Sequence, residues 1–388
     1  MNGSFLKRFR LLTYPDMPFS KELQFLVSAS LSPNKPFSGA MQPDPNSLLK
    51  LAQRHQVRVM LYDYLGQNPI EGGEEILDPL KRYSVEGAVY NMVSLKQSIG
   101  IVYDFEKEGL QVFLMKGALW AWMLYEKPSL REFGDIDYFF QKKDITQGLA
   151  VLARHGYHAD DYRQFLLADA HVAALYFKED YQLPLVPGPD ALIQSLEVQW
   201  NTTYPRFAFS FGYDELMARP MAFDVPGGGQ QIMVPSKEHQ LLMMVIHHAG
   251  VEQWDKLKYM ADFVRMLRKF GPEMDWDYIG NKARQKGFYR LLLESLGLAE
   301  ELTGEKFLKY GKSGMVMKYP TASFKEAVYR HWEHGRMKPK TKSWQIFYFN
   351  MRYRDHWRVK AKILASHLAY LLEWRLLIPK AKYYRKNR

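Results

Sequence analysis

The chain has 388 residues, a length that suggests two or three domains. Its residues are 47% hydrophobic and 15% aromatic, a composition that excludes a disordered protein. It contains no cysteine, which excludes disulfides, thiolate metal sites and a cysteine nucleophile, and suits a reducing cytosol. The net charge of +11 is unevenly placed: residues 336–388 carry 15 Lys and Arg against two acidic residues, and the rest of the chain carries 38 against 40.

Targeting signals are not evident in the sequence. The first residues, MNGSFLKRFRLLTYPD, are basic but lack the apolar core of a signal peptide. No apolar run approaches the roughly 20 residues that span a bilayer. We therefore expect a cytoplasmic protein, with peripheral contact at the inner membrane face as an alternative that the basic tail raises.

A helical region is predicted over residues 1–90. FSKELQFLVSASL and NSLLKLAQRHQVRVMLYDYL have helical patterns, and the Pro- and Gly-bearing segments SPNKPFSG and GQNPIEGG separate them as loops. Asn46 or Ser47 is expected to cap the second helix, because short polar side chains accept hydrogen bonds from the free amides of a first turn.

The pattern changes after a long helix predicted over 84–108, which ends at Gly109. LQVFLMKG, residues 110–117, is a short apolar run bounded by glycine and predicts a buried strand. A helix over 118–126, a loop and a second strand over 135–141 follow.

The rest of this core is a helix over 144–156, with Asp144 as its expected cap, and a third strand over 192–200. Helical patterns return after Pro235, with Ser236 as an N-cap, and the glycines at 227–229 are read as a turn at this boundary. The predicted class is α+β: a small core over 91–234, a helical domain over 235–335 and a basic, aromatic helical tail over 336–388.

Two aspartates mark the second strand. Asp135 and Asp137 are two residues apart, so both side chains point to the same face of a strand. Two parallel carboxylates repel each other unless a cation lies between them, and Mg²⁺ is commonly held by one or two carboxylates together with substrate phosphates. Glu197, on the polar side of the third strand, is the expected third carboxylate. An Asp-x-Asp alone is often only a solvated turn.

Upstream of the aspartates, Lys116 and Gly117 close a strand and open a helix. A helix N-terminus presents free amides and a positive dipole to an anion, and a lysine adds a point charge. Arg131 is placed to form a forked contact with phosphate oxygens, or else to pair with Glu132 or Asp135. The ordered series of strand, Lys-Gly, helix, Arg and Asp-x-Asp is much rarer than any one of its parts.

The segment FLMKGALWAWMLYEKPSLREFGDIDYFF resembles an uncharacterised nucleotidyltransferase-like family of bacterial proteins, within the polymerase-β-like nucleotidyltransferase superfamily. EVQWN resembles its third-carboxylate strand. In HHAGVEQWDKLKYMADFVRML, the spacing of four residues also matches the family: His248, Trp254, Leu257 and Asp262. The resemblance covers roughly residues 40–270. It departs from the usual pattern at Ala118, which offers no hydroxyl, and at Gln199, where the family commonly has His.

The resemblance implies a nucleotidyltransferase-type mixed sheet. It also implies Mg²⁺-dependent transfer of a nucleoside monophosphate from ATP or another nucleoside triphosphate to a hydroxyl acceptor. The acceptor is unknown and would be a small molecule, a protein or RNA. Asp135 and Asp137 would hold the metal, and Glu197 would be the third ligand or the base. Lys116, Gly117 and Arg131 would bind the triphosphate, and His248 would face the cleft. A catalytically silent binding or assembly protein with the same fold is the alternative.

Two further features allow more than one interpretation. Trp254, Tyr259 and Phe263 lie at helical spacing and are read as core rather than as a base-stacking platform. The basic tail alternates aromatics and cations, as nucleic-acid surfaces do. It also has an apolar stripe typical of a helix at a membrane surface, formed by Ile363, Leu364, His367, Leu368, Leu371 and Leu372 near Trp374, Lys380 and Lys382. A third interpretation is a helical pair that packs on the core.

Overall fold

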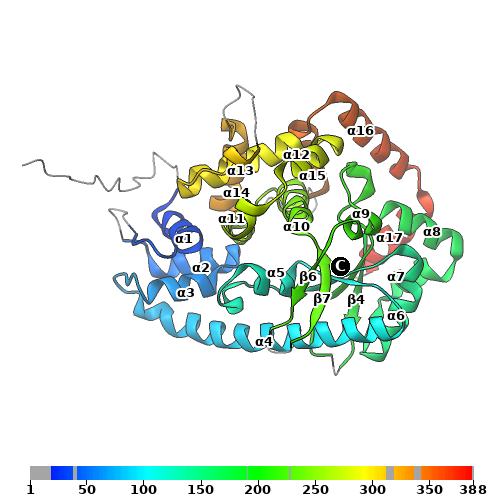
Figure 1. Ribbon diagram of the computed structural model, residues 1–388, viewed down its shortest axis with the longest axis horizontal. Helices are drawn as coiled ribbons and strands as arrows, with labels where there is room; N and C mark the ends of the chain where they lie inside the picture. The colour runs from blue at the N-terminus through cyan, green and yellow to red at the C-terminus, as the bar shows by residue number, and fades with distance from the viewer. Residues whose placement is uncertain are drawn as a thin grey trace, which may run out of the picture.

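The computed structural model describes residues 19–37, 42–189, 191–226, 229–311, 319–335 and 342–386. Within them, the predicted α+β class is confirmed, because a mixed five-stranded sheet is flanked by many helices (Figure 1). Some predicted features lie outside the described residues: the first 18 residues, Gly227 and Gly228 of the glycine turn, and residues 336–341 and 387–388 of the tail.

The central sheet has the strand order β1-β2-β5-β4-β3. The strands are β1 (Phe113–Met115), β2 (Ile136–Phe139), β3 (Tyr157–Ala159), β4 (Gln182–Pro187) and β5 (Leu196–Gln199). β2 and β5 are parallel, and the other neighbouring pairs are antiparallel. The three strands that the sequence predicts are therefore neighbours in the sheet, and two unpredicted strands complete it. A separate antiparallel pair, β6 (Pro220–Asp224) and β7 (Gln231–Pro235), flanks the predicted glycine turn.

The helices that frame the sheet begin with α4 (Glu74–Lys107), which runs along the lower edge of the molecule in Figure 1. It begins ten residues before the predicted start and carries Pro79 inside the helix. The helix α5 (Gly117–Leu124) follows β1 directly, as predicted, and all but one of its residues are buried. The remaining helices near the sheet are α6 (Ile145–Arg154), α7 (Asp161–Ala168), α8 (Ala170–Glu179) and α9 (Tyr213–Met217).

The helices before and after this core agree with the predicted helical regions. Those before it are α1 (Lys21–Leu31), α2 (Pro45–His55) and α3 (Arg58–Leu65). Those after it are α10 (Lys237–Met244), a π-helical turn (Val245–Val251), α11 (Leu257–Phe270), α12 (Trp276–Gln285), α13 (Tyr289–Thr303) and α14 (Ala322–His334). Trp254 and Phe263 are fully buried, so their prediction as core residues is confirmed.

Two predicted caps are wrong and one is right. The cap of α2 is Asp44, whose carboxylate accepts from the Ser47 amide at 2.8 Å, and Pro45 takes the first helical position. Asp144 precedes α6 but makes no cap hydrogen bond, because a 3-10 turn has already placed its backbone in the helical region. Ser236 does cap α10, where its side chain accepts from the His239 amide.

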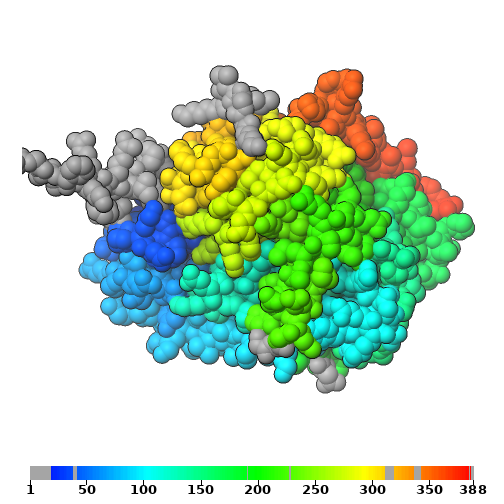
Figure 2. Space-filling view, viewed as in Figure 1, coloured from blue at the N-terminus to red at the C-terminus, as the bar shows by residue number. Residues whose placement is uncertain are grey.

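The basic tail forms three helices, α15 (Lys342–Tyr353), α16 (Trp357–Leu371) and α17 (Trp374–Lys386). In Figure 2, α16 lies at the upper right margin of the molecule, in orange to red, and α17 contacts α7 and α8. No helix in the described parts of the chain is long and apolar enough to cross a membrane.

Candidate functional site

Three carboxylates meet at the paired strands β2 and β5. The parallel register places Asp137 directly beside Glu197, and Asp135 lies just before β2, on the same face as Asp137. One ligand oxygen from each of the three lies within 4.8 Å of the others. Asp135 is exposed, Glu197 is partly exposed and Asp137 is buried, so the cluster opens to solvent on one side. The structure therefore brings together the three acidic residues that the sequence singled out.

Asp137 is held by two side chains from the neighbouring strands. Lys116 directly follows the β1 residue that pairs with Asp137, and its Nζ lies 3.4 Å from Asp137 Oδ1. Gln199 donates to the same oxygen at 2.5 Å, and its own Oε1 accepts from Lys116 at 3.3 Å. These contacts fix the direction in which the buried carboxylate points.

Gln199 also orients the third carboxylate. Its Nε2 lies 3.1 Å from Glu197 Oε2, and Gln182 on β4 donates to Glu197 Oε1 at 3.0 Å. Gln182 pairs with Gln199 across the antiparallel β4–β5 ladder, so both amides are on the face that carries Glu197. The sequence analysis did not identify Gln182 because it did not predict β4. Its position beside Glu197 follows from the pairing of β4 with β5, which a sequence pattern alone does not give.

The electrostatics of the cluster favour a bound cation. Burial raises the pKa of the Asp137 carboxyl well above its usual range, and Asp135 and Glu197 raise it further, while Lys116 opposes the shift. Burial also acts against the charge on Lys116, but Asp137 and Glu197 outweigh it and raise the pKa of the lysine. One lysine thus faces three carboxylates. An all-oxygen donor set with excess negative charge is compatible with a hard divalent cation.

The start of α5 lies against this cluster. Lys116 has a positive φ of 46°, and Gly117 follows with a φ of 20°. A Cβ on Gly117 would lie 2.6 Å from the backbone oxygen of Asp135, so only glycine fits between the helix start and the acidic loop. This close approach brings the N-terminal end of α5, with its unpaired amides, next to the carboxylates.

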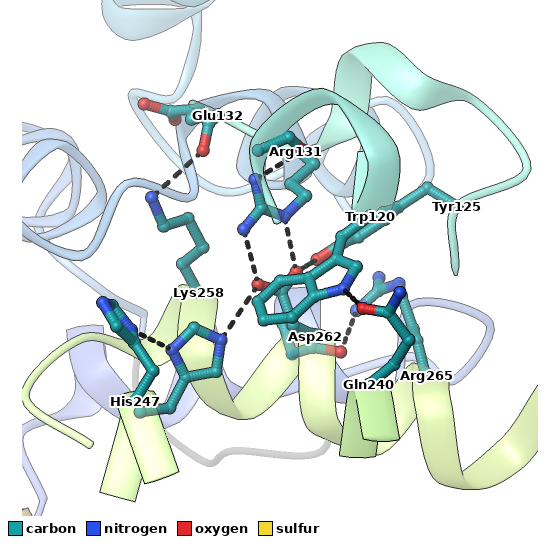
Figure 3. Close-up of polar contacts among 12 residues, drawn as sticks. Trp120, Tyr125, Arg131, Glu132, Gln240, His247, Lys258, Asp262 and Arg265 are labelled. Carbon is teal, nitrogen blue, oxygen red and sulfur yellow. Dashed lines mark hydrogen bonds and ion pairs between the residues drawn. The ribbon is translucent and has the colours of Figure 1, made fainter. Parts of the chain in front are cut away.

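Arg131 is buried next to the acidic cluster and is held by α11. Its Nε and Nη2 each donate to Asp262 on α11 at 2.9 Å, and its Nη1 donates to the Gly117 carbonyl at 3.0 Å (Figure 3). The arginine therefore joins the start of α5 to α11. Of the two partners considered from the sequence, Glu132 instead pairs with Arg58 at 2.7 Å. The phosphate contact predicted for Arg131 stays a prediction.

His248 and Tyr125 complete the surroundings of Asp262. The Tyr125 hydroxyl donates to Asp262 at 2.7 Å (Figure 3). His248 Nε2 lies 3.6 Å from the same carboxylate. Burial would raise the pKa of Asp262, but Arg131 and its hydrogen bonds hold it well below the usual range. Burial lowers the pKa of His248 to about 4, so its imidazole is neutral at pH 7. The carboxylate of Asp262 is thus permanently charged, with Arg131 as its counter-ion.

Lys258 is a cation that the sequence argument passed over. It lies four residues before Asp262 on α11, which places the two on one helix face. Its Nζ donates to the Glu132 carbonyl at 3.1 Å (Figure 3). Burial, and then Arg131, lower the pKa of Lys258 to about 8, while Asp262 and Asp135 oppose the shift. Lys258 lies in the segment that resembles the family, and its spacing of four residues from Asp262 could have identified it from the sequence.

Comparison with known families gives one match. A model described as an uncharacterised nucleotidyltransferase matches residues 42–304. This range includes the five-stranded sheet, the three carboxylates and the Arg131–Asp262 pair, and it ends before the basic tail. No curated protein and no solved structure matches the chain.

Proposed function

The chain belongs to the uncharacterised nucleotidyltransferase family, and from this we propose that it transfers a nucleoside monophosphate from a nucleoside triphosphate to a hydroxyl acceptor. The observation that carries the proposal is the meeting of Asp135, Asp137 and Glu197 within 4.8 Å, beside the start of α5. The family match and the acidic cluster support each other, because the cluster lies inside the matched residues.

The three carboxylates would hold Mg²⁺, which when bound neutralises phosphate charge and polarises the reacting phosphoryl group. Asp137 and Glu197 are already oriented for this by Gln199 and Gln182. Oriented ligands lose little freedom on binding, which is why supporting hydrogen bonds commonly strengthen metal sites.

The triphosphate would be bound by cations and amides of the same face. Lys116 is within reach of Asp137 and would turn from this carboxylate toward a phosphate. The amides at the start of α5, beginning with Gly117, would donate hydrogen bonds to the oxygens of the same phosphate. Lys258, beside the Glu132 carbonyl, adds a second ammonium. Direct contacts from Arg131 and His248 remain part of the proposal, although both now contact Asp262.

The proposed reaction needs a proton acceptor. The acceptor hydroxyl forms a bond to the α-phosphorus, the bond to the β-phosphate oxygen breaks, and pyrophosphate leaves. The hydroxyl proton would go to Glu197, the partly exposed member of the cluster, or to bulk water if Glu197 serves only as a metal ligand. ATP is one possible donor among the nucleoside triphosphates.

Calorimetric titration tests the proposal. The intact protein is titrated with each of the four nucleoside triphosphates, in Mg²⁺ and in EDTA. We expect binding of at least one triphosphate in Mg²⁺, loss of that binding in EDTA, and loss in the Asp135→Asn/Asp137→Asn variant. The matched control is Asp78→Asn/Asp161→Asn, which changes two exposed aspartates outside the cluster. Equal binding by the cluster variant and the wild type would refute the site.

A silent binding protein is the second candidate, and one observation favours it. Lys116 and Gln199 already satisfy the buried oxygen of Asp137 without any ion. If no triphosphate binds in Mg²⁺, this internal pairing is the stable state of the site. The function would then belong to another surface, for which the tail is the best place to look.

A further inference from the structure

An unusual amount of apolar side chain is exposed on α16. Trp357 is 73% exposed, Leu364 45%, Leu368 56% and Leu371 63%. They follow one another at intervals of seven, four and three residues, which places them on a single face of the helix. Monomeric proteins commonly expose isolated leucines, but a stripe of this length usually marks a contact surface.

The neighbouring face of α16 is the one that packs on the protein. Ile363 is fully buried, the ring of His367 lies 5.0 Å from that of Phe207, and Arg206 lies over the Tyr370 ring. At about 100° per residue, these three positions are centred about 100° around the helix from the stripe of Leu364, Leu368 and Leu371. The helix therefore has two apolar faces, and the protein covers only one.

Apolar side chains are also exposed after α16. Leu372, at the end of the helix, is 78% exposed, and Trp374 and Ile378 on α17 are 61% and 48% exposed. In Figure 1, α16 runs along the upper right of the molecule, and α17 lies further in, beside α7 and α8. We call the exposed apolar residues of these two helices, with the cations around them, the α16–α17 surface.

Positive charge borders this surface. Residues 357–386 contain eight Lys and Arg and one acidic residue, Glu373. At about 100° per residue, Arg358 and Lys362 lie on one side of the α16 stripe and Lys360 lies on the other. Among the described side chains, four of these cations form no ion pair and are available to external anions: Arg358, Lys360, Lys362 and Lys382. Arg375 and Lys380 interact instead with Asp169 and Asp180 of the chain.

We propose that the α16–α17 surface binds an anionic lipid bilayer. A stripe of Leu and Trp bordered by cations on both sides matches a membrane interface, where apolar side chains enter the acyl region and cations meet lipid phosphates. A nucleic acid is a poorer fit, because Leu364, Leu368 and Leu371 have no ring on which a base stacks. A second copy is also a poorer fit, since two surfaces with the same excess of positive charge repel.

The test is flotation of the full-length protein with vesicles. Phosphatidylcholine vesicles are compared with vesicles that also contain phosphatidylglycerol, at low and high salt. We expect binding to the anionic vesicles, weaker binding in high salt, and little binding to pure phosphatidylcholine. The Leu368→Glu/Leu371→Glu variant should bind at least about 100-fold more weakly, since each leucine withdrawn from lipid costs about tenfold or more.

The matched control is Val85→Glu/Met92→Glu, which changes two exposed apolar residues on α4, 59% and 60% exposed. It should float like the wild type, as should Asp135→Asn/Asp137→Asn, so the result does not depend on the proposed nucleotidyl transfer. Unchanged flotation of the leucine variant would overturn the proposal. The proposal would also be overturned if the protein bound no vesicles but bound a single-stranded oligonucleotide. A third contrary result would be a protein that binds no vesicles and forms a dimer in sedimentation velocity that the leucine substitutions dissociate.

Discussion

Gly117 and Asp135 touch through their backbones: a Cβ added to Gly117 would lie 2.6 Å from the carbonyl oxygen of Asp135. This contact joins the strand–helix turn after β1 to the loop before β2. The Lys-Gly pair thus has a structural use in addition to the proposed contact with phosphate, since it allows α5 to begin beside the carboxylates.

Gly117→Ala should separate these two backbones. The new methyl group meets a backbone oxygen that cannot rotate away, and the positive φ disfavours any side chain. We expect a loss of about 1–3 kcal/mol in the free energy of unfolding, measured in urea, and weaker Mg²⁺-dependent triphosphate binding. Gly100→Ala on α4 is the control, since its Cβ meets nothing within 4 Å and alanine favours a helix. Equal stability of the two variants would contradict the contact.

The buried pair of Arg131 and Asp262 should contribute strongly to stability. Their side chains are 4% and 0% exposed, so removal of one partner leaves an unpaired charge in the interior. We expect Arg131→Met to lower the free energy of unfolding by about 3–5 kcal/mol. The exposed pair of Lys127 and Asp63, at 65% and 33%, is the matched control, and Lys127→Met should cost about 1 kcal/mol or less.

A double-mutant cycle separates the pair from its surroundings. If Arg131→Met/Asp262→Leu is no less stable than either single variant, the cost of each single change lies in the charge left behind. Additive losses would instead show that the two residues act independently and would contradict the pairing.

The local parts of this site were predictable from sequence, and the distant pairings were not. Asp135 and Asp137 share a face because a strand has a period of two, and Glu197 could be assigned by the same alternation. Arg131 was expected near phosphate or its sequence neighbours, but its partner lies 131 residues away on α11. No local pattern reveals which helix of the later region packs on α5.

The strands and helix starts that were missed also have physical causes. β4 contains Pro184 and Pro187, and proline argues against a strand with neighbours on both sides because it lacks a donor. Pro79 lies inside α4, and a proline disfavours a helix interior, so local preference does not favour the observed early start. In both places, packing against the core outweighs the local preference, and this packing is not visible from a short window of sequence.

Acid should destabilise the protein through His55, which is fully buried between α11 and α14. Its Nδ1 accepts from the Leu257 amide at 3.1 Å, and its Nε2 lies 3.1 Å from the Trp332 carbonyl, an arrangement that needs the neutral ring. Burial, together with Arg54, lowers the pKa of His55 to about 3. The unfolded chain takes up this proton near pH 6.5, so the stabilisation is complete above that pH and falls as the pH drops toward 3.

Urea unfolding at several pH values measures this effect. Between pH 6.5 and 5.5, we expect His55 to account for a loss of roughly 1 kcal/mol in the free energy of unfolding. His55→Gln should be less stable than the wild type at pH 7.5 but should lose less on acidification. His158→Gln, at an exposed position on β3, is the control and should follow the wild type. An identical acid loss in His55→Gln would exclude His55 as a source.

Lys258 should make triphosphate binding sensitive to alkaline pH. Its pKa is lowered to about 8, first by burial and then by Arg131, so the ammonium is charged at pH 7 and largely neutral at pH 9. The pKa of Lys116 is raised by Asp137 and Glu197, so Lys116 keeps its charge over the same range. If Lys258 contacts the triphosphate, affinity in Mg²⁺ should fall by about tenfold between pH 7 and pH 9, the usual scale for one charged contact.

Two variants locate that loss. Lys258→Arg keeps a charge at pH 9 and should bind equally well at both pH values, because a guanidinium does not deprotonate there. Lys258→Met should bind weakly at both, with little change between them. Lys269→Met is the control: it removes a lysine from the same helix whose Nζ donates to the Met123 carbonyl, and it should retain the wild-type pH profile. A profile that survives in Lys258→Met would assign the alkaline loss to another group and remove Lys258 from the proposed site.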